Sequence, residues 1–355
     1  MVPRSMSSRP AVASSHRLAR ALVSSSRSLS SASAPALASA LMKRLIMNAL
    51  SPGSMLRALL ALCGALLLRR LTRSMKRKNL RGRIVLVTGA ATGIGREQAF
   101  KFAAKGARLV LWDIAYEQLL KTAEDVRTAT PSAQVFAYKC DLSKREEIYR
   151  VAETVKKDVG SVWCLVNNAG IISGREFLQT DDRRIELTMA VNTMAHFWTA
   201  KAFLPDMLEA NSGAIVTISS AAGVFVQPRM VDYCTSKFAA KGLALALRSE
   251  IAALGKTGVR VSCICPAHIN TDLFKGFDMM GLTMEPAYVA NKVVEAAMYG
   301  PAVMMLPHIM GPATIMQELF PQWVWDLATL PSRSTMNNWD PTKANKVFAA
   351  MSKKA

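Results

Sequence analysis

The sequence contains few residues of the kinds that build metal sites or disulfide frameworks. Its 355 residues include only six cysteines and four histidines. The one close cysteine pair, Cys263 and Cys265, is spaced too tightly for a Cys-x-x-Cys metal knuckle. The four histidines are widely separated along the chain, so we predict packing or surface roles for them. The sequence therefore predicts no metal site, and the scattered cysteines suit a reducing compartment.

Acidic residues are absent from the first 83 positions. This part carries 16 Lys and Arg, whereas the rest of the chain carries 29 basic and 25 acidic residues, so the net charge of +20 belongs mainly to a leader. A nucleic-acid-binding protein would instead gather its basic excess on a folded face. We therefore predict no nucleic-acid partner.

The leader also lacks an apolar run long enough to span a bilayer. Residues 1–40 are rich in Ser, Ala and Arg, a composition typical of organellar transit peptides. Residues 41–81 form a predicted hydrophobic anchor and basic linker, but its apolar core, residues 58–68, is eleven residues long, against about 20 for a spanning helix. We expect an interfacial or hairpin anchor whose basic cluster meets anionic headgroups. The alternative is a cleaved leader without a membrane role.

From residue 82 onwards, strand-like apolar runs alternate with helical patterns. Strands are predicted at residues 84–88, 107–112, 134–139, 162–166, 214–220 and 259–264, the last of these being the final paired strand, and long helices at 182–209 and 232–254. This alternation predicts an α/β fold, a Rossmann-type doubly wound parallel sheet. We expect one catalytic domain over residues 82–310 and a C-terminal extension over 311–355 that serves as a lid or membrane contact.

A glycine-rich turn follows the first predicted strand and leads into a helix expected to begin near Arg96. Its spacing is Gly-x-x-x-Gly-x-Gly, not the commoner Gly-x-Gly-x-x-Gly. Small residues let the backbone approach a pyrophosphate, whose charge then lies at the helix N-terminus. The predicted cofactor contacts here are Thr88, Gly89, Gly93, Ile94 and Gly95. A second turn of small residues, Asn168, Ala169 and Gly170, is expected to lie against the same cofactor.

Two aspartates follow later strands. Asp113 comes eighteen residues after Gly95, where a carboxylate can accept hydrogen bonds from an adenosine ribose and repel a 2′-phosphate. This position favours NAD, although Asp113 could be only a turn or cap residue and Arg96 could tolerate the phosphate of NADP. Asp141 could reach the adenine, but an aspartate followed two residues later by a serine is also an ordinary helix start.

Tyr233 and Lys237 lie four residues apart on a predicted helix and so share one face. A neighbouring ammonium group lowers the pKa of a tyrosine, which is ordinarily about 10. Ser220 lies thirteen residues upstream, at the carboxyl end of a predicted strand, where open α/β sheets place their reacting atoms. The second Tyr-x-x-x-Lys spacing, Tyr288 with Lys292, has no such serine, and we predict a structural role for it.

These features together resemble the short-chain dehydrogenase/reductase family over residues 82–307. The resemblance rests on six ordered elements: residues 88–95, Asp141, residues 167–170, Asn192, Ser220, and Tyr233 with Lys237. A finer resemblance is to the membrane-associated branch that holds 17β-hydroxysteroid and retinol dehydrogenases. It rests on residues 111–114, 195–198 and 233–239.

The resemblance implies a role for each residue of the expected catalytic group. Tyr233 would be the general acid and base, and Ser220 would hold the substrate oxygen. Lys237 would lower the pKa of the tyrosine and bind the nicotinamide ribose, while Asn192 would support a water that links the lysine to solvent. The tyrosine would take the hydroxyl proton as hydride passes to the nicotinamide.

The resemblance also places Pro266 and Thr271 beside the nicotinamide. The family usually has Pro-Gly where this chain has Pro266 and Ala267, so the backbone is expected to differ slightly there. An ordinary strand exit is the alternative interpretation.

Two apolar segments are expected to form the substrate wall, the stretch between Ser220 and Tyr233 and residues 272–284. They contribute Val226, Met230 and Phe274, and such side chains make an adaptable wall for a steroid, a retinoid or another lipid alcohol. The alternative is that they pack a lid or an interface.

The sequence thus predicts an NAD(P)-dependent oxidoreductase that acts on a lipophilic alcohol or ketone. We expect a homodimer, paired through the two long helices, on a membrane such as the endoplasmic reticulum or on a lipid droplet. One alternative is an NADPH-dependent carbonyl or 3-oxoacyl reductase of an organelle such as the mitochondrion. Another is a non-catalytic scaffold on a lipid surface.

Overall fold

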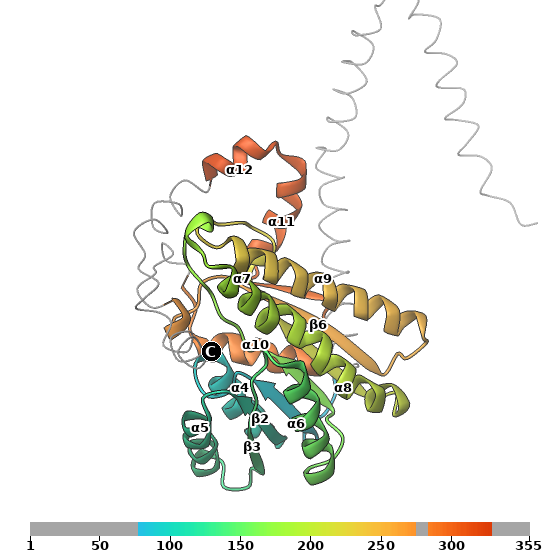
Figure 1. Cartoon of the computed structure of the whole chain (residues 1–355). Coiled ribbons are helices and arrows are strands. Elements are labelled where there is room, and N and C mark those ends of the chain that lie inside the picture. Colours follow the sequence, from blue (N-terminus) through green and yellow to red (C-terminus); the bar gives the residue numbers. More distant parts are fainter. Residues whose placement is uncertain (1–76, 275–282, 329–355) are drawn as a thin grey trace, which may run out of the picture. The chain divides into compact units, whose positions relative to one another are not determined.

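The computed structural model describes residues 77–274 and 283–328 (Figure 1). The predicted leader, nearly all of the predicted anchor and linker, and residues 329–355 of the C-terminal extension lie outside the described residues. Within the described ranges, no helix is both long and apolar enough to cross a membrane. The same ranges contain no cluster of His, Cys, Asp and Glu that could bind a metal ion.

One parallel sheet of seven strands forms the centre of the described domain, in the order β3-β2-β1-β4-β5-β6-β7. The strands are β1 (Ile84–Thr88), β2 (Arg108–Asp113), β3 (Val135–Lys139), β4 (Cys164–Asn167), β5 (Gly213–Ile218), β6 (Val259–Pro266) and β7 (Val303–Leu306). The strand order reverses between β1 and β4, which is where an open α/β sheet binds its ligands. The predicted doubly wound fold is confirmed.

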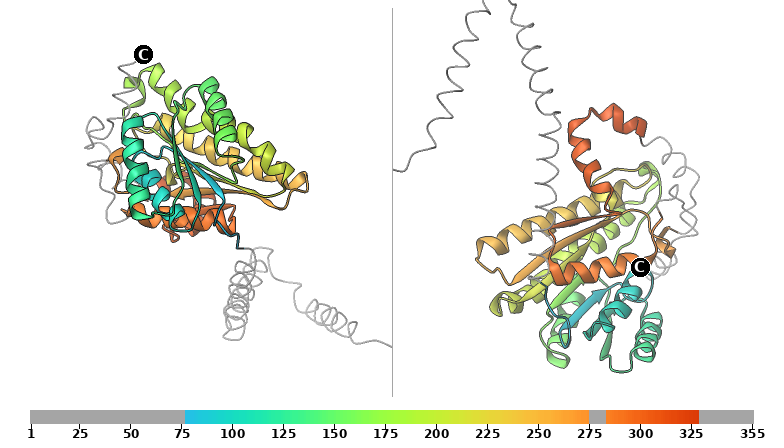
Figure 2. Two further views of the ribbon diagram at one scale, coloured as in Figure 1. Left: turned by 90° about the horizontal axis from the view of Figure 1, so that it is seen from below. Right: turned by 180° about the vertical axis from the view of Figure 1, so that it is seen from behind.

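Helices cover both faces of the sheet because neighbouring strand residues point to opposite sides. In β1, Val85 and Val87 belong to one core, whereas Ile84 and Leu86 belong to the other. The first core is covered by α4 (Gly93–Ala103), α5 (Tyr116–Ala129) and α10 (Pro286–Tyr299). The second is covered by α6 (Arg145–Asp158), α8 (Ala195–Glu209) and α9 (Val231–Ala253). Figure 2 shows the sheet between these layers.

Apart from shifts of one or two residues at the ends of elements, the prediction differs from the structure at three places. The strand at Val259 is not the last one, because β7 pairs with β6 in parallel. Helix α4 begins at Gly93, three residues before the predicted start, since the glycine turn itself forms the first helical turn. The predicted helix over 182–209 is divided into α7 (Asp182–Met189), a π-helical turn η3 (Ala190–Met194) and α8.

Two short helices follow β7, α11 (Met310–Leu319) and α12 (Gln322–Ala328). In Figure 1 they lie at one end of the described domain, and α5 and β3 lie at the other. They form the described part of the predicted C-terminal extension.

Candidate active site

A cavity of about 690 Å³ lies along the carboxyl ends of the strands. Most of the residues predicted for the site border it: Gly89, Gly93, Ile94, Gly95, Asp113, Asp141, Asn168, Ala169, Gly170, Ser220, Met230, Tyr233, Lys237, Pro266, Thr271 and Phe274. Three predicted residues do not. Thr88 and Asn192 are buried behind the cavity wall, and Val226 is 59% exposed beside a separate shallow groove. Val226 does not border the cavity in the described residues, so its predicted contact with substrate stays a prediction.

The glycine turn forms a cradle that larger residues would fill. Gly89 and Gly93 have φ angles of 64° and 55°, in the left-handed region that favours glycine. A Cβ atom on Gly89 would lie 2.8 Å from Cα of Ala169, and one on Gly95 would lie 2.7 Å from Nδ2 of Asn168. The first residues of α4 border the cavity, so unpaired backbone N–H groups are available there for an anionic pyrophosphate.

Thr88 holds the two cofactor turns together from behind. Its Oγ1 accepts hydrogen bonds from the backbone nitrogens of Asn168 and Ala169, at 3.0 and 3.1 Å. Nδ2 of Asn168 donates in return to the Thr88 carbonyl oxygen at 2.8 Å, and Oδ1 of Asn168 accepts from Gln98. Thr88 and the Asn168 side chain therefore shape the cradle through contacts with protein atoms.

Asp113 fits both interpretations drawn from the sequence, a cap of local turns and a contact for the adenosine ribose. Its two carboxylate oxygens accept hydrogen bonds from the backbone nitrogens of Ala91 and Ala115, each at 2.9 Å, so it caps two turns. It also borders the cavity. Burial raises the pKa of Asp113, and the backbone hydrogen bonds offset part of this rise.

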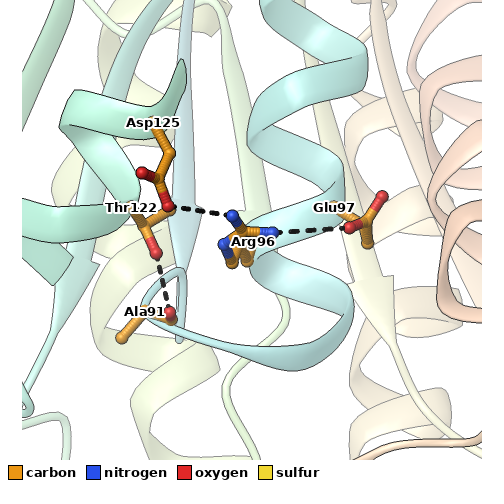
Figure 3. Close-up of polar contacts among 5 residues, drawn as sticks. All are labelled: Ala91, Arg96, Glu97, Thr122 and Asp125. Carbon is orange, nitrogen blue, oxygen red and sulfur yellow. Dashed lines mark hydrogen bonds and ion pairs between the residues drawn. The ribbon is translucent and has the colours of Figure 1, made fainter. Parts of the chain in front are cut away.

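Arg96 does not border the cavity, and its side chain reaches towards Asp125 on α5 (Figure 3). It donates a 2.9 Å hydrogen bond to Asp125 and lies 3.7 Å from Glu97, and its guanidinium lies over the Phe100 ring. Figure 3 also shows Thr122, whose hydroxyl donates to the carbonyl oxygen of Ala91 at 2.8 Å. Because its charge is compensated by two carboxylates, Arg96 is poorly placed to attract a 2′-phosphate.

Asp141 forms a local turn at the start of α6. Its Oδ1 accepts from the backbone nitrogen and the hydroxyl of Ser143, at 3.0 and 2.6 Å, and its Oδ2 lies 3.7 Å from Nζ of Lys144. This is the ordinary helix-start geometry that the sequence left open. The residue also borders the cavity, so one oxygen can still face a ligand.

Tyr233 is buried at the start of α9 and forms a hydrogen bond with Ser220. Burial raises the pKa of Tyr233, and the Ser220 hydrogen bond offsets part of the rise. This direction is opposite to the one predicted from the lysine alone, because taking a phenolate out of water costs more than the nearby groups return. Ser220 Oγ also accepts from Ala222 and lies 3.4 Å from the Pro266 carbonyl oxygen, which fixes its position.

Lys237 lies on the same face of α9, one turn after the tyrosine. Its Nζ is 5.5 Å from the centre of the Tyr233 ring and donates to the Ile218 carbonyl oxygen at 3.1 Å. Burial lowers the pKa of Lys237 to about 8, so the ammonium and the amine both lie within reach near neutral pH. A Cβ atom on Gly170 would lie 3.2 Å from this nitrogen, which explains the small residue at that position.

Asn192 lies in the π-helical turn η3, a feature that is frequent at functional sites. Its Nδ2 donates to the Ile171 carbonyl oxygen at 2.9 Å and to Ser236 Oγ at 3.0 Å, while its Oδ1 accepts from the Ile171 nitrogen at 2.8 Å. Both amide hydrogens are therefore used by protein atoms. The side chain holds the turn after β4 against α9, and the water predicted to contact Asn192 stays a prediction.

The substrate half of the cavity is apolar and includes residues that the sequence did not single out. The Phe274 ring lies edge-on to Tyr233 at 6.0 Å and to His268 at 5.7 Å. His268, predicted as a packing or surface residue, borders the cavity and contacts Thr283 at 2.9 Å. From α11 and α12, Met310 and Trp325 also border the cavity. Only the position of His268 directly after Pro266 and Ala267 could have signalled its place.

The second Tyr-x-x-x-Lys pair lies outside this site. Tyr288 is on α10 and partly exposed, and Lys292 forms an ion pair with Glu295 at 3.1 Å. Neither residue borders the cavity. The structural role predicted for this pair agrees with its place in the fold.

Comparisons with known proteins point to one family. The sequence profile described as short chain dehydrogenase matches residues 83–280. The chain is 44% identical over 253 residues to estradiol 17-beta-dehydrogenase 11 of Rattus norvegicus, covering 71% of this chain and 84% of that protein. It is 42% identical over 252 residues to epidermal retinol dehydrogenase 2 of Mus musculus, covering 70% and 81%.

Solved structures show the same fold. A short chain dehydrogenase/reductase from Burkholderia phymatum in complex with NAD aligns with a TM-score of 0.62 and 24% identity, covering 68% of this chain and 94% of that one. A metagenomic short-chain oxidoreductase in complex with NADP aligns with a TM-score of 0.55 and 28% identity, covering 64% and 97%.

Proposed function

The chain belongs to the short-chain dehydrogenase family, and we propose that it is an NAD-dependent oxidoreductase of a lipophilic alcohol. The observation that carries the proposal is the grouping of Ser220, Tyr233 and Lys237 at the apolar end of a cavity whose other end is a glycine cradle. One end suits a lipid alcohol and the other suits a pyrophosphate. The relatives named as an estradiol dehydrogenase and a retinol dehydrogenase support a steroid, a retinoid or a similar lipid alcohol.

The residues present fit a nicotinamide dinucleotide. The glycine cradle and the start of α4 would hold its pyrophosphate, Asp113 its adenosine ribose, and Thr271 and Lys237 its nicotinamide half. When bound, the cofactor supplies the hydride acceptor. Ser220 holds the substrate oxygen, and Tyr233 removes the hydroxyl proton. Lys237 stabilises the tyrosinate as an ammonium ion, and because its pKa is lowered to about 8, its amine form can take up the proton that Tyr233 has removed and release it near neutral pH.

NAD is the preferred cofactor in this proposal. Asp113 borders the cavity at the end of β2, where its carboxylate disfavours a 2′-phosphate. Arg96, the phosphate partner considered from the sequence, is compensated by Asp125 and Glu97. NADP use is expected to be weaker, not absent.

A substrate screen tests the function directly. Purified full-length protein is assayed with retinol, steroid alcohols and long-chain fatty alcohols, each with NAD and with NADP. We expect turnover of at least one lipid alcohol with a preference for NAD. Preference for NADPH with small or thioester-linked ketones would instead favour the organellar carbonyl or 3-oxoacyl reductase, which the transit-peptide-like composition of residues 1–40 supports. Binding of lipid without any turnover would favour the scaffold.

A membrane or lipid-droplet surface is the proposed location, with the endoplasmic reticulum as the membrane and the mitochondrion as the alternative. Eight large apolar side chains are more than half exposed in the described residues: Phe177, Leu178, Val226, Leu254, Ile309, Leu319, Trp323 and Leu327. Five of these are neighbours of segments that border the cavity, namely Val226 and the four on or beside α11 and α12. Exposed apolar patches of this kind mark interaction surfaces.

Vesicle binding tests this surface. Trp323→Ser with Leu319→Ser is expected to weaken binding of the full-length protein to phosphatidylcholine vesicles that contain phosphatidylserine. Leu254→Ser is the matched control, because Leu254 is similarly exposed but lies at the end of α9, away from the cavity. Equal binding by all three proteins would contradict the proposed surface.

The proposed homodimer pairs through α8 and α9. Both helices expose large apolar side chains, including Phe197 on α8 and Phe238 and Leu245 on α9. Sedimentation of the detergent-solubilised protein is expected to give a dimer, and Phe238→Glu is expected to give a monomer. A wild-type monomer would remove this part of the proposal.

A further inference from the structure

Asp232, the residue directly before Tyr233, is a buried carboxylate with two partners from separate segments. Its Oδ1 accepts a hydrogen bond from the hydroxyl of Ser173 at 2.7 Å, and its Oδ2 accepts one from the hydroxyl of Thr188 at 2.9 Å. Both partners are themselves buried. Ser173 follows the turn after β4, and Thr188 is on α7.

Burying a carboxylate is costly unless its oxygens are well bonded. In the described part of the chain, the partners of Asp232 are two neutral hydroxyls and not a cation. These hydrogen bonds therefore return little net free energy of folding for the cost of burying the carboxylate. The N-terminal end of α9 favours a negative charge at Asp232. An exposed carboxylate at the same position would gain the same stabilisation, so this effect does not explain the burial. The burial therefore points to positioning.

The segment that Asp232 holds forms one wall of the tyrosine site. Ile172, directly before Ser173, packs in a small apolar cluster with Met230, Tyr233 and Cys234. On the other side of Ile172, the backbone of Ile171 is held by the Asn192 side chain. Ile172 is thus fixed from both sides against the ring whose hydroxyl must meet the substrate.

The same network joins α7, the π-helical turn and α9. Thr188 binds Asp232, Asn192 binds Ser236, and the hydroxyl of Thr193 donates to the Ser236 carbonyl oxygen at 3.0 Å. All these groups are buried, and buried networks with every member bonded rigidify the segments they join.

We propose that Asp232 is a positioning residue that acts through Tyr233, by clamping Ile172 and α7 against the catalytic ring. The inference rests on the proposed function, because it assigns Asp232 a part in orienting the tyrosine of that reaction. Without the clamp, Ile172 can move away and the tyrosine hydroxyl loses its fixed approach to Ser220. Misplacement of a catalytic group by about 1 Å can cost roughly a hundredfold in rate.

Four substitutions in the full-length protein test the clamp: Asp232→Ala, Asp232→Asn, Ser173→Ala and Thr188→Val. Asp232→Ala is expected to lower kcat roughly ten- to hundredfold, while the dissociation constant for NAD changes by less than about twofold. Asp232→Asn should restore most of kcat, because an amide can still bond both hydroxyls. Combining Ser173→Ala with Asp232→Ala should add little further loss, since both remove one interaction.

Asp206→Asn is the matched control. It removes a partly buried carboxylate that pairs with Lys156 at 3.1 Å, between α6 and α8, and it is expected to lower the melting temperature without lowering kcat. If Asp232→Ala does not fold, the Ser173 and Thr188 variants carry the test through the same split between kcat and NAD binding.

Unchanged kcat in Asp232→Ala, or in both hydroxyl variants, would overturn the clamp. A loss that Asp232→Asn fails to restore, or that falls equally on NAD binding, would overturn it too. Failure of the proposed function is separate and would appear in the wild-type protein, as a lack of turnover in the alcohol screen.

Discussion

The ammonium nitrogen of Lys237 lies 5.5 Å from the centre of the Tyr233 ring, and its hydrogen bond goes to the Ile218 carbonyl oxygen at 3.1 Å. The lysine is thus anchored to the end of β5 and acts on the tyrosine through space. Burial raises the pKa of the tyrosine and lowers that of the lysine, so proton transfer depends on groups that a bound substrate and cofactor bring to the cavity.

Gly170→Ala tests whether turnover depends on the present position of the Lys237 ammonium group. The added Cβ would lie 3.2 Å from Nζ of Lys237, so the ammonium must shift, and kcat is expected to fall roughly tenfold. Gly242→Ala is the matched control, because it is on α9 and a Cβ there meets nothing within 4 Å. Steady-state kinetics of both variants decide the point, and equal activity would contradict it.

The preference for NAD over NADP is expected to depend on the carboxylates of Asp113 and Asp125. Asp113→Asn removes the charge that disfavours a 2′-phosphate, and Asp125→Asn releases Arg96 from its 2.9 Å ion pair. The double variant is expected to shift the ratio of kcat/KM values towards NADP by roughly ten- to hundredfold, from one new charge-assisted hydrogen bond. Each single variant should shift it less.

Glu124→Gln is the control for Asp125→Asn. Glu124 is the neighbouring acid on α5 and pairs with Arg127 at 3.1 Å, so its removal leaves Arg96 compensated. If Glu124→Gln shifts the ratio of kcat/KM values for NADP and NAD as far as Asp125→Asn does, the overall loss of negative charge, and not the release of Arg96, determines the cofactor preference.

His196 is expected to make the fold sensitive to acid. It is buried, and in the described residues neither of its ring nitrogens has a hydrogen-bond partner. Burial, and then the charge of Lys237, lower its pKa from 6.5 to about 3. Because the folded-state pKa is lowered, its contribution is fully present above pH 6.5 and is lost as the pH falls from 6.5 towards 3.

Urea unfolding of the wild type and of His196→Leu measures this contribution. The stability of the wild type relative to the variant should fall by up to about 1.4 kcal/mol for each pH unit below 6.5. Comparing the two proteins removes the effect of the carboxylates, which are common to both. Parallel curves between pH 7 and pH 4.5 would show that His196 is not buried in a neutral form.

The two tryptophans of α12 are expected to separate substrate fit from lipid contact. Trp325 borders the cavity and lies 6.1 Å from Phe225, ring to ring, whereas Trp323 is 67% exposed. Trp325→Ala should raise KM for the preferred alcohol roughly tenfold in detergent and favour bulkier alcohols, by loss of apolar contact area. Trp323→Ala should leave KM in detergent unchanged. Similar effects of both would contradict the assignment of Trp325 to the cavity.

The sequence could predict the fold because each strand of the central sheet is a short apolar run followed by a turn of small or polar residues. It failed at β7, where the four-residue run Val303–Leu306 is short and rich in methionine, so only pairing with β6 makes it a strand. The π-helical turn around Asn192 was also hidden, because it depends on tertiary hydrogen bonds to Ile171 and Ser236.

The site was predictable where backbone geometry or helical spacing fixes a position, as for Gly93 and Lys237. It was less predictable where a polar side chain can bond either ligand or protein. Thr88 was predicted to contact the cofactor and Asn192 to support a water, and in the structure both side chains bond protein atoms. Asp232 gave no local signal, because its partners come from distant segments, and the one signal for His268 was its position directly after Pro266 and Ala267.

Hydride transfer by Tyr233→Phe tests the central claim most directly. The variant removes only the hydroxyl, and the ring keeps its packing against Ile172 and Phe274. NADH formation from the alcohol found in the screen should fall at least about a thousandfold, while NAD binding and thermal stability stay near those of the wild type. Turnover close to the wild-type rate in a folded, NAD-binding Tyr233→Phe protein would contradict the account.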